Sequence, residues 1–348
     1  MVRYNKYQKV PLHSSNYFDE CWMRFNATSN MSLNISMKTD FWLPESDSVL
    51  AALAFAVVGL CGTLLNILVI VSLLRSVELR KGYLTPSIVS IAITDLIFSI
   101  VGGIYGSTHF FIRDVPLPSG CQAFSLIYYV LWMCSALNLL GIAVLRCLLV
   151  YYPRKTKNEV FGKATKVMPI MAWVVSFTWL LPTLIGKYGQ FGLDCKLLSC
   201  WFINQDVSGY NANPELTYCF GIMVIGIIVF LLNLLTYAKI ADYTKSFLSA
   251  NSSAELEAKK KIVEKERRLG KMVTVIIISY FIVYLPVVIL RVVEPNITIT
   301  KPKLFVTSGI FASSIGVIDP LVYTVFNEKY RNEVKSLVKD MINFLSFS

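Results

Sequence analysis

Long runs without a charged side chain recur along the sequence and predict its secondary structure. Five runs contain no Asp, Glu, Lys or Arg, and they span residues 48–74, 115–145, 167–186, 216–238 and 272–290. Two more runs, residues 82–112 and 304–327, are interrupted by one acid each, Asp95 and Asp319. Each run can cross a hydrocarbon layer of roughly 30 Å, which takes about 20 helical residues. Because a membrane β-barrel would show shorter segments of alternating polarity, the pattern predicts an all-α membrane protein with seven transmembrane helices.

The composition and the distribution of charge agree with this prediction and orient the chain. Of 348 residues, 55% are hydrophobic and 16% are charged, whereas a soluble domain carries about 25% charged residues. Of the 33 lysines and arginines, 22 fall in the segments on the C-terminal side of the membrane. Because such residues accumulate in cytoplasmic loops, we expect a multi-pass plasma-membrane protein with an extracellular N-terminus and a cytoplasmic C-terminus. This topology accounts for the net charge of +11, so we do not expect a nucleic-acid partner.

The predicted domain organisation is simple. Residues 1–47 form an extracellular tail, residues 48–326 form the seven-helix domain, and residues 327–348 form an amphipathic eighth helix with a short cytoplasmic tail. That last segment places apolar residues on one helical stripe and lysines opposite, as in a helix on a membrane surface. The basic connector between the fifth and sixth helices is rich in helix-forming residues, so we interpret it as a cytoplasmic extension of helix six.

Two further signals mark the outer side. Glycosylation sequons occur at four positions in the outer segments: Asn26, Asn30, Asn34 and Asn296. Four of the eight cysteines also lie in the outer segments, where they can oxidise: Cys21, Cys121, Cys195 and Cys200. Four cysteines permit three pairings, and spacing alone does not choose between them.

The two acids inside the apolar runs are the first candidates for a functional role. A charge in the hydrocarbon region costs several kcal/mol unless it faces a polar cavity or a partner. Asp95 and Asp319 are therefore expected to face the interior of the bundle, with Asn66 and Ser135 as polar neighbours. The alternative is that each acid is only hydrogen-bonded and has no function.

Several short motifs occur in a fixed order along residues 48–338, and together they resemble the rhodopsin-like (class A) G-protein-coupled receptors. They are Asn66 in GLCGTLLN, Asp95 in SIAITDL, Cys121 and Arg146 at the two ends of helix three, Trp173 in helix four, Pro286 in VYLP, Asp319 to Tyr323 in DPLVY, and Tyr330. The segments YGQFGLDCKLLSCWF, YYPRK, ERRLGKM and FNEKYR are similar to the moody and trapped-in-endoderm group of orphan receptors, which are distantly related to melatonin receptors.

The resemblance implies roles for several residues. It implies a disulfide between Cys121 and Cys200, with Cys195 as the rival of Cys200 and with Cys21–Cys195 as a second bridge. It also implies a water-filled pocket that holds an allosteric sodium ion, lined by Asn66, Asp95, Ser135 and Asp319. A proton shared by the two acids is the alternative to the ion. No other cofactor or metal is implied.

The resemblance also makes Arg146 the cytoplasmic activation switch. In the family a preceding acid holds this arginine in the inactive state, and release lets it meet Tyr237, Tyr323 and a heterotrimeric G protein, with arrestin as a second partner. Here the preceding residue is Leu145, so Glu266 is the only candidate partner that the sequence offers. This departure predicts a weaker inactive state and raised basal activity. The alternative is that Arg146 extends to the lipid boundary.

Other positions of the activation route match or depart from the family pattern. The matches are Pro286 and Pro320; the departures are Val229 in place of a proline, Tyr284 in place of a tryptophan, and Ala136 with Tyr280 in the packing between helices three, five and six. These departures leave an atypical receptor without normal signalling as an alternative.

The sequence places a ligand pocket but says little about the ligand. Its candidate residues are Tyr105, His109, Tyr128, Trp132 and Arg291. Tyr128 stands where amine receptors have an acid, which argues against an amine, and helix seven has no lysine for a retinal Schiff base. An aromatic cavity capped by an arginine suits an apolar ligand with an anionic end. Aromatic core packing with a lipid-headgroup arginine is the alternative.

Two other classes of protein fit the sequence less well. A transporter would often show internal repeats or broken helices, and only the helix prolines Pro86, Pro286 and Pro320 meet that pattern. An enzyme needs a nucleophile with a base, or metal ligands, and neither His13 nor His109 has a ligand at metal-binding spacing. The ordered motifs favour a receptor that transduces binding of an unknown extracellular ligand.

Overall fold

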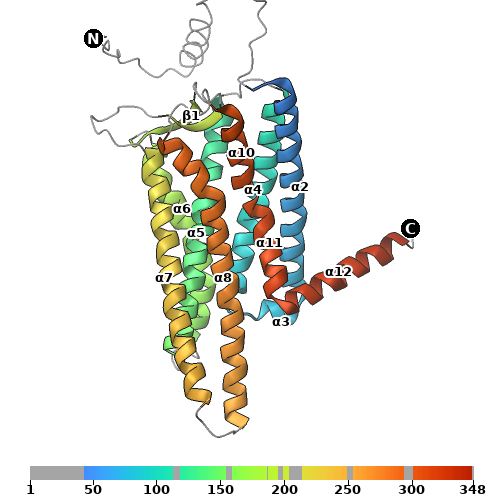
Figure 1. Ribbon diagram of the computed structural model, residues 1–348, viewed down its shortest axis with the longest axis vertical. Coiled ribbons are helices and arrows are strands. Elements are labelled where there is room, and N and C mark those ends of the chain that lie inside the picture. The colour runs from blue at the N-terminus through green and yellow to red at the C-terminus, as the bar shows by residue number, and fades with distance from the viewer. Residues whose placement is uncertain are drawn as a thin grey trace, which may run out of the picture.

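A computed structural model of the chain describes residues 43–112, 118–153, 159–185, 187–194, 199–203, 214–248, 254–293 and 301–346. Within these ranges seven helical stretches are long and apolar enough to cross a membrane. They run side by side along one axis and form a single bundle (Figure 1). The prediction of an all-α, seven-helix protein is confirmed.

The elements follow one another in a simple order. They are α2 (Glu45–Arg75), α3 (Val77–Arg80), α4 (Thr85–Ile112), α5 (Pro118–Tyr151), α6 (Glu159–Leu184), β1 (Gln190–Asp194), β2 (Ser199–Ile203), α7 (Pro214–Leu248), α8 (Ala254–Val293), α10 (Pro302–Ser313), α11 (Ile315–Phe326) and α12 (Glu328–Ser346). Since α8 begins at Ala254, the basic connector continues the sixth transmembrane helix, as the sequence predicts. The seventh span consists of two helices, α10 and α11.

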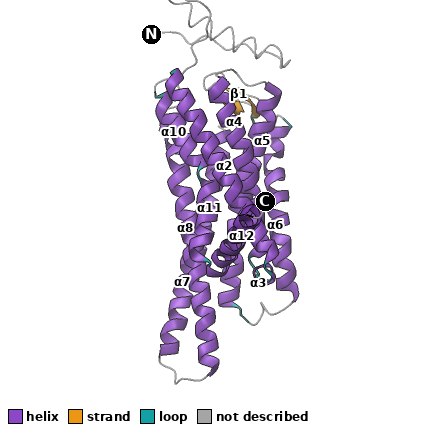
Figure 2. Ribbon diagram, turned by 90° about the vertical axis from the view of Figure 1, so that its right-hand side faces the viewer, coloured by secondary structure: helices purple, strands orange, loops and turns teal. Residues whose placement is uncertain are grey.

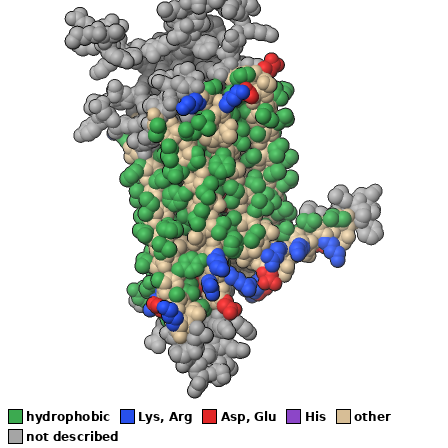
Figure 3. Space-filling view, viewed as in Figure 1, with side chains coloured by type: hydrophobic (Ala, Val, Ile, Leu, Met, Phe, Trp, Pro, Cys, Tyr) green, Lys and Arg blue, Asp and Glu red, His purple; other side chains and the backbone are tan. Residues whose placement is uncertain are grey.

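The outer surface of the bundle carries a broad apolar band. Large hydrophobic side chains face outward along most of its length, among them Leu53 on α2, Ile170 on α6 and Leu231 on α7. Charged side chains gather above and below this band (Figure 3). A surface of this kind suits lipid at the middle of the bundle and water at its ends.

The contact between α2 and α4 depends on glycines. A Cβ atom on Gly59 would lie 2.7 Å from the Cα of Gly103, and a Cβ on Gly103 would lie 2.8 Å from the Cα of Gly59. The two backbones therefore approach as closely as small residues allow, which is how helices pack in lipid, where no hydrophobic effect drives them together.

The two halves of the seventh span meet at Ser314, and Pro320 lies inside the second half, α11. A proline has no N–H, so Pro320 leaves the carbonyl of Gly316 without its usual helical donor. The side chain of Asn66 on α2 takes that place: its Nδ2 donates to the Gly316 carbonyl at 2.8 Å and to the Gly62 carbonyl at 2.9 Å. Asn66 thus satisfies the backbone carbonyl that the proline has left without a donor.

A polar contact on α4 connects three helices. The hydroxyl of Ser90 accepts a hydrogen bond from the indole Nε1 of Trp173 on α6 at 3.2 Å and one from Nδ2 of Asn138 on α5 at 3.1 Å. The helix-four tryptophan is thereby fixed against its neighbours.

The short helix α12 leaves the bundle sideways where α11 ends (Figure 1), and it is seen almost end on in Figure 2. Tyr330 in its first turn is only 2% exposed and packs into the inner core of the bundle. Burial raises the pKa of Tyr330 to about 12. Arg75 at the end of α2 pairs with Glu333 at 3.4 Å and with Asp340 at 2.8 Å. Lysines line one edge of α12, and hydrophobic side chains lie above them (Figure 3), as the predicted amphipathic helix requires.

At the opposite end of the bundle, β1 and β2 form an antiparallel hairpin that the sequence did not predict. Cys200 on β2 forms a disulfide with Cys121 on α5, so the predicted pairing is confirmed. The backbone N–H of Cys200 also donates to the hydroxyl of Tyr105 on α4 at 3.1 Å. The proposed second bridge, Cys21–Cys195, and the sequons at Asn26, Asn30, Asn34 and Asn296 lie outside the described residues.

We predict that Asn66→Ala lowers the stability of the bundle. The substitution leaves the buried carbonyl of Gly316 without a donor, which costs about 1–3 kcal/mol. Thr63→Val is the matched control on the same helix, because it removes a bond from the Thr63 hydroxyl to the Gly59 carbonyl, four residues earlier in the same helix. Thermal unfolding of the purified protein in detergent should show a clear drop in Tm for Asn66→Ala and little change for Thr63→Val. Equal melting temperatures for Asn66→Ala and the unsubstituted protein would contradict this account.

Candidate functional site

Arg146 lies in the last turns of α5, inside the bundle. Its side chain is 0% exposed, so it does not extend to the lipid boundary, and that alternative from the sequence is wrong. A buried guanidinium is costly unless its charge is paired and its donors are hydrogen-bonded. The contacts of this side chain are therefore needed to stabilise its charge at this end of the bundle, the end from which α12 leaves.

Two helices supply those contacts. The guanidinium donates to Oδ1 of Asn233 on α7 and, through its second terminal nitrogen, to the backbone carbonyl of Glu266 on α8 at 3.0 Å. Its Nε lies 3.8 Å from Oε2 of Glu266. Glu266 is the partner that the sequence suggested. Arg146 on α5 thus connects this helix to both α7 and α8.

The carboxylate of Glu266 is itself buried and has a second partner. The hydroxyl of Tyr83 in the loop before α4 donates to both oxygens, at 2.9 and 3.0 Å. Burial, and next the Glu266 carboxylate, raise the pKa of Tyr83 well above its usual value, so the hydroxyl keeps its proton and remains a donor. We call Arg146, Glu266, Tyr83 and Asn233 the inner lock.

Sequence reasoning missed Tyr83 and Asn233. They lie 183 residues before Glu266 and 87 residues after Arg146, and no spacing rule connects residues so far apart. Leu145, which replaces the family acid, is 0% exposed and belongs to the inner hydrophobic core. The local ion pair is therefore replaced by apolar packing, and the arginine is held by other segments instead.

Gly270 on α8 makes room for the inner lock. A Cβ atom at this position would lie 2.6 Å from a terminal nitrogen of Arg146 and 3.0 Å from the ring of Tyr237 on α7. The two predicted switch residues Arg146 and Tyr237 therefore both lie against this glycine. The third, Tyr323 on α11, is buried, and its hydroxyl has no hydrogen-bond partner among the described residues.

The two intramembrane acids come together in the middle of the bundle. Asp95 on α4 is 3% exposed and Asp319 on α11 is 0% exposed. Asp95 lies within hydrogen-bonding reach of both Asp319 and Ser135, and Ser135 in turn shares a 2.7 Å hydrogen bond with Thr94. Apart from Asp95, no described side chain or backbone N–H donates to either oxygen of Asp319. Two adjacent carboxylates need a shared proton or a cation between them, and carboxylate and hydroxyl oxygens suit a small hard cation.

The predicted ligand-pocket residues form part of a continuous series of rings. Tyr105 stacks on His109 with ring centroids 5.8 Å apart and on Phe124 at 3.8 Å. Further into the bundle, Tyr128 and Trp132 are 6.4 Å apart, and Trp132 and Tyr284 on α8 are 4.8 Å apart. The structure thus brings Tyr105, His109, Tyr128 and Trp132 into one series of neighbouring rings. We call this series, which ends at Tyr284, the aromatic layer. The side chain of Arg291 lies outside what the structure describes.

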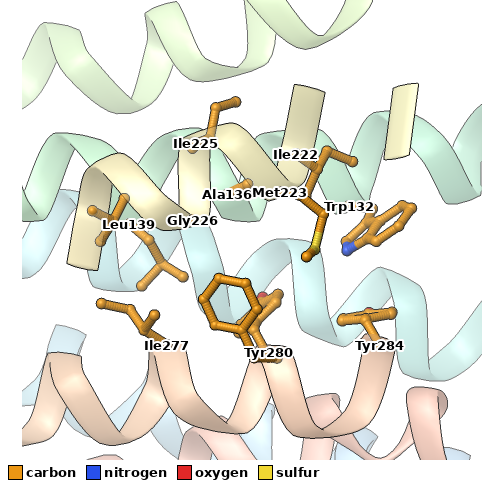
Figure 4. A pocket seen from close by; sticks show the side chains of 12 residues that line it. Trp132, Ala136, Leu139, Ile222, Met223, Ile225, Gly226, Ile277, Tyr280 and Tyr284 are labelled. Atoms are coloured by element: carbon orange, nitrogen blue, oxygen red, sulfur yellow. The ribbon is translucent and has the colours of Figure 1, made fainter. Parts of the chain in front are cut away.

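The departures from the family pattern share one location. Ala136, Val229, Tyr280 and Tyr284 all line a small cavity between α5, α7 and α8 (Figure 4). Substitutions that are scattered over 148 residues of sequence therefore alter a single packing region, which Trp132 also lines.

Comparison with known proteins identifies the family. The sequence model of the family described as "7 transmembrane receptor (rhodopsin family)" matches residues 65–323. That range covers most of the chain and includes six of the seven spans from end to end or nearly so. The chain belongs to the rhodopsin family of seven-transmembrane receptors.

Comparison with individual proteins shows which members of the family this receptor resembles. It is 24% identical to Protein trapped in endoderm-1 of Drosophila melanogaster over 91% of this chain and 83% of that protein. It is 23% identical to the G-protein coupled receptor moody of the same fly over 81% of this chain, which spans about half of that protein (49%). The predicted resemblance to the moody and trapped-in-endoderm group is confirmed, and the receptor is not an enzyme.

A solved structure supports the fold independently. The receptor superposes on squid rhodopsin with a TM-score of 0.74 and 19% sequence identity, over 84% of this chain and 81% of that one. The shared fold includes the seven-helix bundle in which the inner lock and the acid pair lie. The family membership and the fold give no support to a transporter.

We predict that Gly270→Ala opens the inner end of the receptor. The added methyl group displaces Arg146 from Glu266, while alanine favours the helix by about 1 kcal/mol, so a general loss of folding is not expected. The change is measured as the distance between spin labels at Arg80→Cys and Arg267→Cys, with Cys61 and Cys147 replaced by serine. A longer distance should become populated.

The matched control is Gly162→Ala on α6, because a Cβ atom there meets nothing within 4 Å. It should leave the distance distribution of the unsubstituted receptor unchanged. If Gly270→Ala and Gly162→Ala gave the same distribution, Gly270 would have no part in holding the inner lock.

Proposed function

We propose that this receptor transduces the binding of an extracellular ligand into activation of a heterotrimeric G protein at the plasma membrane. The excess of lysine and arginine on one side supports an extracellular N-terminus and a cytoplasmic C-terminus. In that orientation the inner lock faces the cytoplasm, and the hairpin with its disulfide faces outward. The G protein, with arrestin as a further partner, would bind at the end where Arg146 lies.

The observation that carries this proposal is the complete burial of Arg146 between α5, α7 and α8. Breaking a buried ion pair by removing one partner costs about 3–5 kcal/mol, so Arg146 and Glu266 hold the two helices together until something offsets that cost. A G protein that offered its own acceptors to the guanidinium would do so. Two states with different contacts for one charge are the requirement of a switch.

The ligand side of the proposal rests on the aromatic layer. Rings follow one another from Tyr105, beside the disulfide, to Tyr284 on α8. A ligand bound among Tyr105, His109, Tyr128, Trp132 and Arg291 would therefore contact the helix that also carries Glu266. Tyr128 argues against an amine ligand, and the absence of a lysine from residues 304–327 argues against retinal.

The expectation of a weak inactive state stays a prediction, and the structure defines what decides it. Leu145 contributes no charge, so the inactive state depends on Glu266, Asn233 and Tyr83. The receptor lacks the additional local acid of the family pattern, and we expect measurable activity without ligand.

The acid pair would act as a second, allosteric site for sodium. The oxygens of Asp95, Asp319 and Ser135 would hold the ion, and the positive charge would remove the repulsion between the two carboxylates. Because the ion would bind between α4, α5 and α11, it would stabilise the arrangement in which these helices are close.

We predict that Tyr83→Phe raises ligand-free G-protein activation. The substitution removes the hydroxyl that orients the Glu266 carboxylate but keeps the ring that packs against Phe161. One hydrogen bond to a charged group contributes about 1.5–3 kcal/mol, so a several-fold rise is expected. The measurement is nucleotide exchange by a panel of purified G proteins with the receptor in lipid nanodiscs.

Two further variants serve as controls for this measurement. Arg146→Ala should abolish exchange, because it removes the group that would contact the G protein. Glu266→Gln should raise exchange as Tyr83→Phe does. A receptor that produced no exchange with any G protein, in unsubstituted form and in both lock variants, would refute signalling through G proteins and favour the atypical, non-signalling alternative.

We predict that sodium stabilises the receptor through the acid pair. A ligand that binds only the folded state adds stability as RT ln(1 + [L]/Kd), about 2.7 kcal/mol at a concentration of 100 Kd. Tm should therefore be higher in sodium chloride than in choline chloride at equal ionic strength. Asp95→Asn and Asp319→Asn should each abolish the difference. Equal Tm values in both salts for the unsubstituted receptor would leave the shared proton as the explanation.

A further inference from the structure

The cavity between α5, α7 and α8 has features of a binding site, and it shares only Trp132 with the proposed ligand pocket. Its volume is about 50 Å³, and none of its twelve lining residues carries a charge. Trp132, Tyr280 and Tyr284 are the lining residues with a polar atom. Figure 4 shows Trp132 and Tyr284 at one end and Leu139 and Ile277 at the other, with Gly226 of α7 between them.

The wall between α7 and α8 faces the bilayer. Met223, Gly226 and Phe281 are only half-buried although they line the cavity. Their sequence neighbours Ile227 and Ile282 are 49% and 56% exposed on the apolar outer surface. A Cβ atom on Gly226 would lie 3.1 Å from the tip of the Phe281 ring, so this ring lies directly over the glycine. A rotation of Phe281 would connect the cavity with the lipid.

An indole N–H in the cavity has no acceptor. Trp132 is 7% exposed, and its Nε1 has no hydrogen-bond partner among the described residues. Figure 4 shows this nitrogen on the side of the ring that faces Met223. Buried indole N–H groups usually find an acceptor, as that of Trp173 does at Ser90. The one of Trp132 is therefore a donor available to a bound molecule.

We propose that this cavity binds one end of a neutral, membrane-dissolved molecule whose carbonyl or ether oxygen accepts a hydrogen bond from Trp132. The uncharged lining excludes a charged head group, which would be left without a partner in a low-dielectric site. The volume admits only a few heavy atoms, since a pocket for a whole drug-sized ligand has about 300–1,000 Å³. The rest of the molecule therefore stays in the bilayer, between α7 and α8.

The occupant would contact the helices that carry the inner lock. Tyr280 and Tyr284 belong to α8, as does Glu266, and Gly226 belongs to α7, as does Asn233. This part of the inference rests on the proposed function. The binding itself rests only on the cavity, and a receptor that activated no G protein could still confirm it.

The test uses two photoreactive probes on the purified receptor in nanodiscs. The first is the methyl ester of a long-chain fatty acid that carries a diazirine next to the ester and a terminal alkyne. The second is an alkane with the same two groups but no ester. Labelled positions are mapped by mass spectrometry. The ester probe should label α5, α7 and α8 around the cavity in a saturable way, and an excess of unlabelled methyl ester should prevent this.

Three variants test the contacts. Trp132→Phe keeps an aromatic ring and removes the donor, so it should weaken the apparent affinity for the ester probe about five- to tenfold, as expected for one hydrogen bond, without changing labelling by the alkane. Ala136→Leu fills the cavity and should abolish saturable labelling. Trp179→Phe is the matched control, because Trp179 is 44% exposed and is not among the residues that line the cavity, and it should change neither.

Two results would overturn the proposal. One is labelling that rises in proportion to probe concentration and spreads over the lipid-facing helices. The other is equal saturable labelling by the ester in Trp132→Phe and in the unsubstituted receptor, when Tm shows that the variant is folded. Loss of nucleotide exchange with retained ester labelling would instead contradict the proposed signalling function alone.

Discussion

A polar group that this bundle buries is costly unless it has a partner inside the protein, because hydrocarbon offers none. The constraint acts at three depths. Near the outer end, the hydroxyl of Tyr105 accepts from the N–H of Cys200 beside the disulfide. In the middle, Asn66 satisfies the carbonyl of Gly316. At the inner end, Arg146 is enclosed by Asn233 and Glu266. The structure is specified at these contacts, and it can change state only where one of them has an alternative partner.

The middle and inner contacts belong to one arrangement. Pro320 lies inside α11 and leaves the carbonyl of Gly316 without its usual helical donor, and Asn66 connects this carbonyl to α2. Asp319, which directly precedes the proline, then faces Asp95 in the same layer. A proline and an acid that look misplaced in an apolar run therefore belong to one arrangement: the proline frees a carbonyl that Asn66 satisfies, and the acid before it meets Asp95. A partner that binds the acids can act on helix seven as a whole.

The positions that depart from the family pattern also have specific contacts in the structure. Leu145 stands where the family has an acid. In the inner lock Glu266 supplies the negative charge instead, and the hydroxyl of Tyr83 donates to its carboxylate. Val229, Ala136, Tyr280 and Tyr284 line one cavity. The first change moves the restraint on Arg146 to other helices, and the second set changes the packing through which those helices would move.

The sequence was sufficient for the spans and for part of the site. Uncharged runs identify membrane helices because the cost of a charge in lipid is large and local, and Glu266 could be named because it is the only acid at the right level of helix six. The disulfide partner came from resemblance, since spacing does not choose between Cys195 and Cys200. Tyr83, Asn233 and the unpartnered Trp132 could not be predicted, because contacts between distant segments leave no periodic pattern and an aromatic residue in an apolar run resembles ordinary core.

The central claim is that Arg146 and Glu266 stabilise each other inside the folded bundle. A double-mutant cycle measures this most directly, with Arg146→Met, Glu266→Gln and the double variant compared by reversible unfolding in mixed detergent micelles. The account predicts a coupling free energy of at least about 1 kcal/mol, within the range found for contacting residues. Effects that add to within about 0.5 kcal/mol, as for independent sites, would show that the two residues do not act together and would contradict the account.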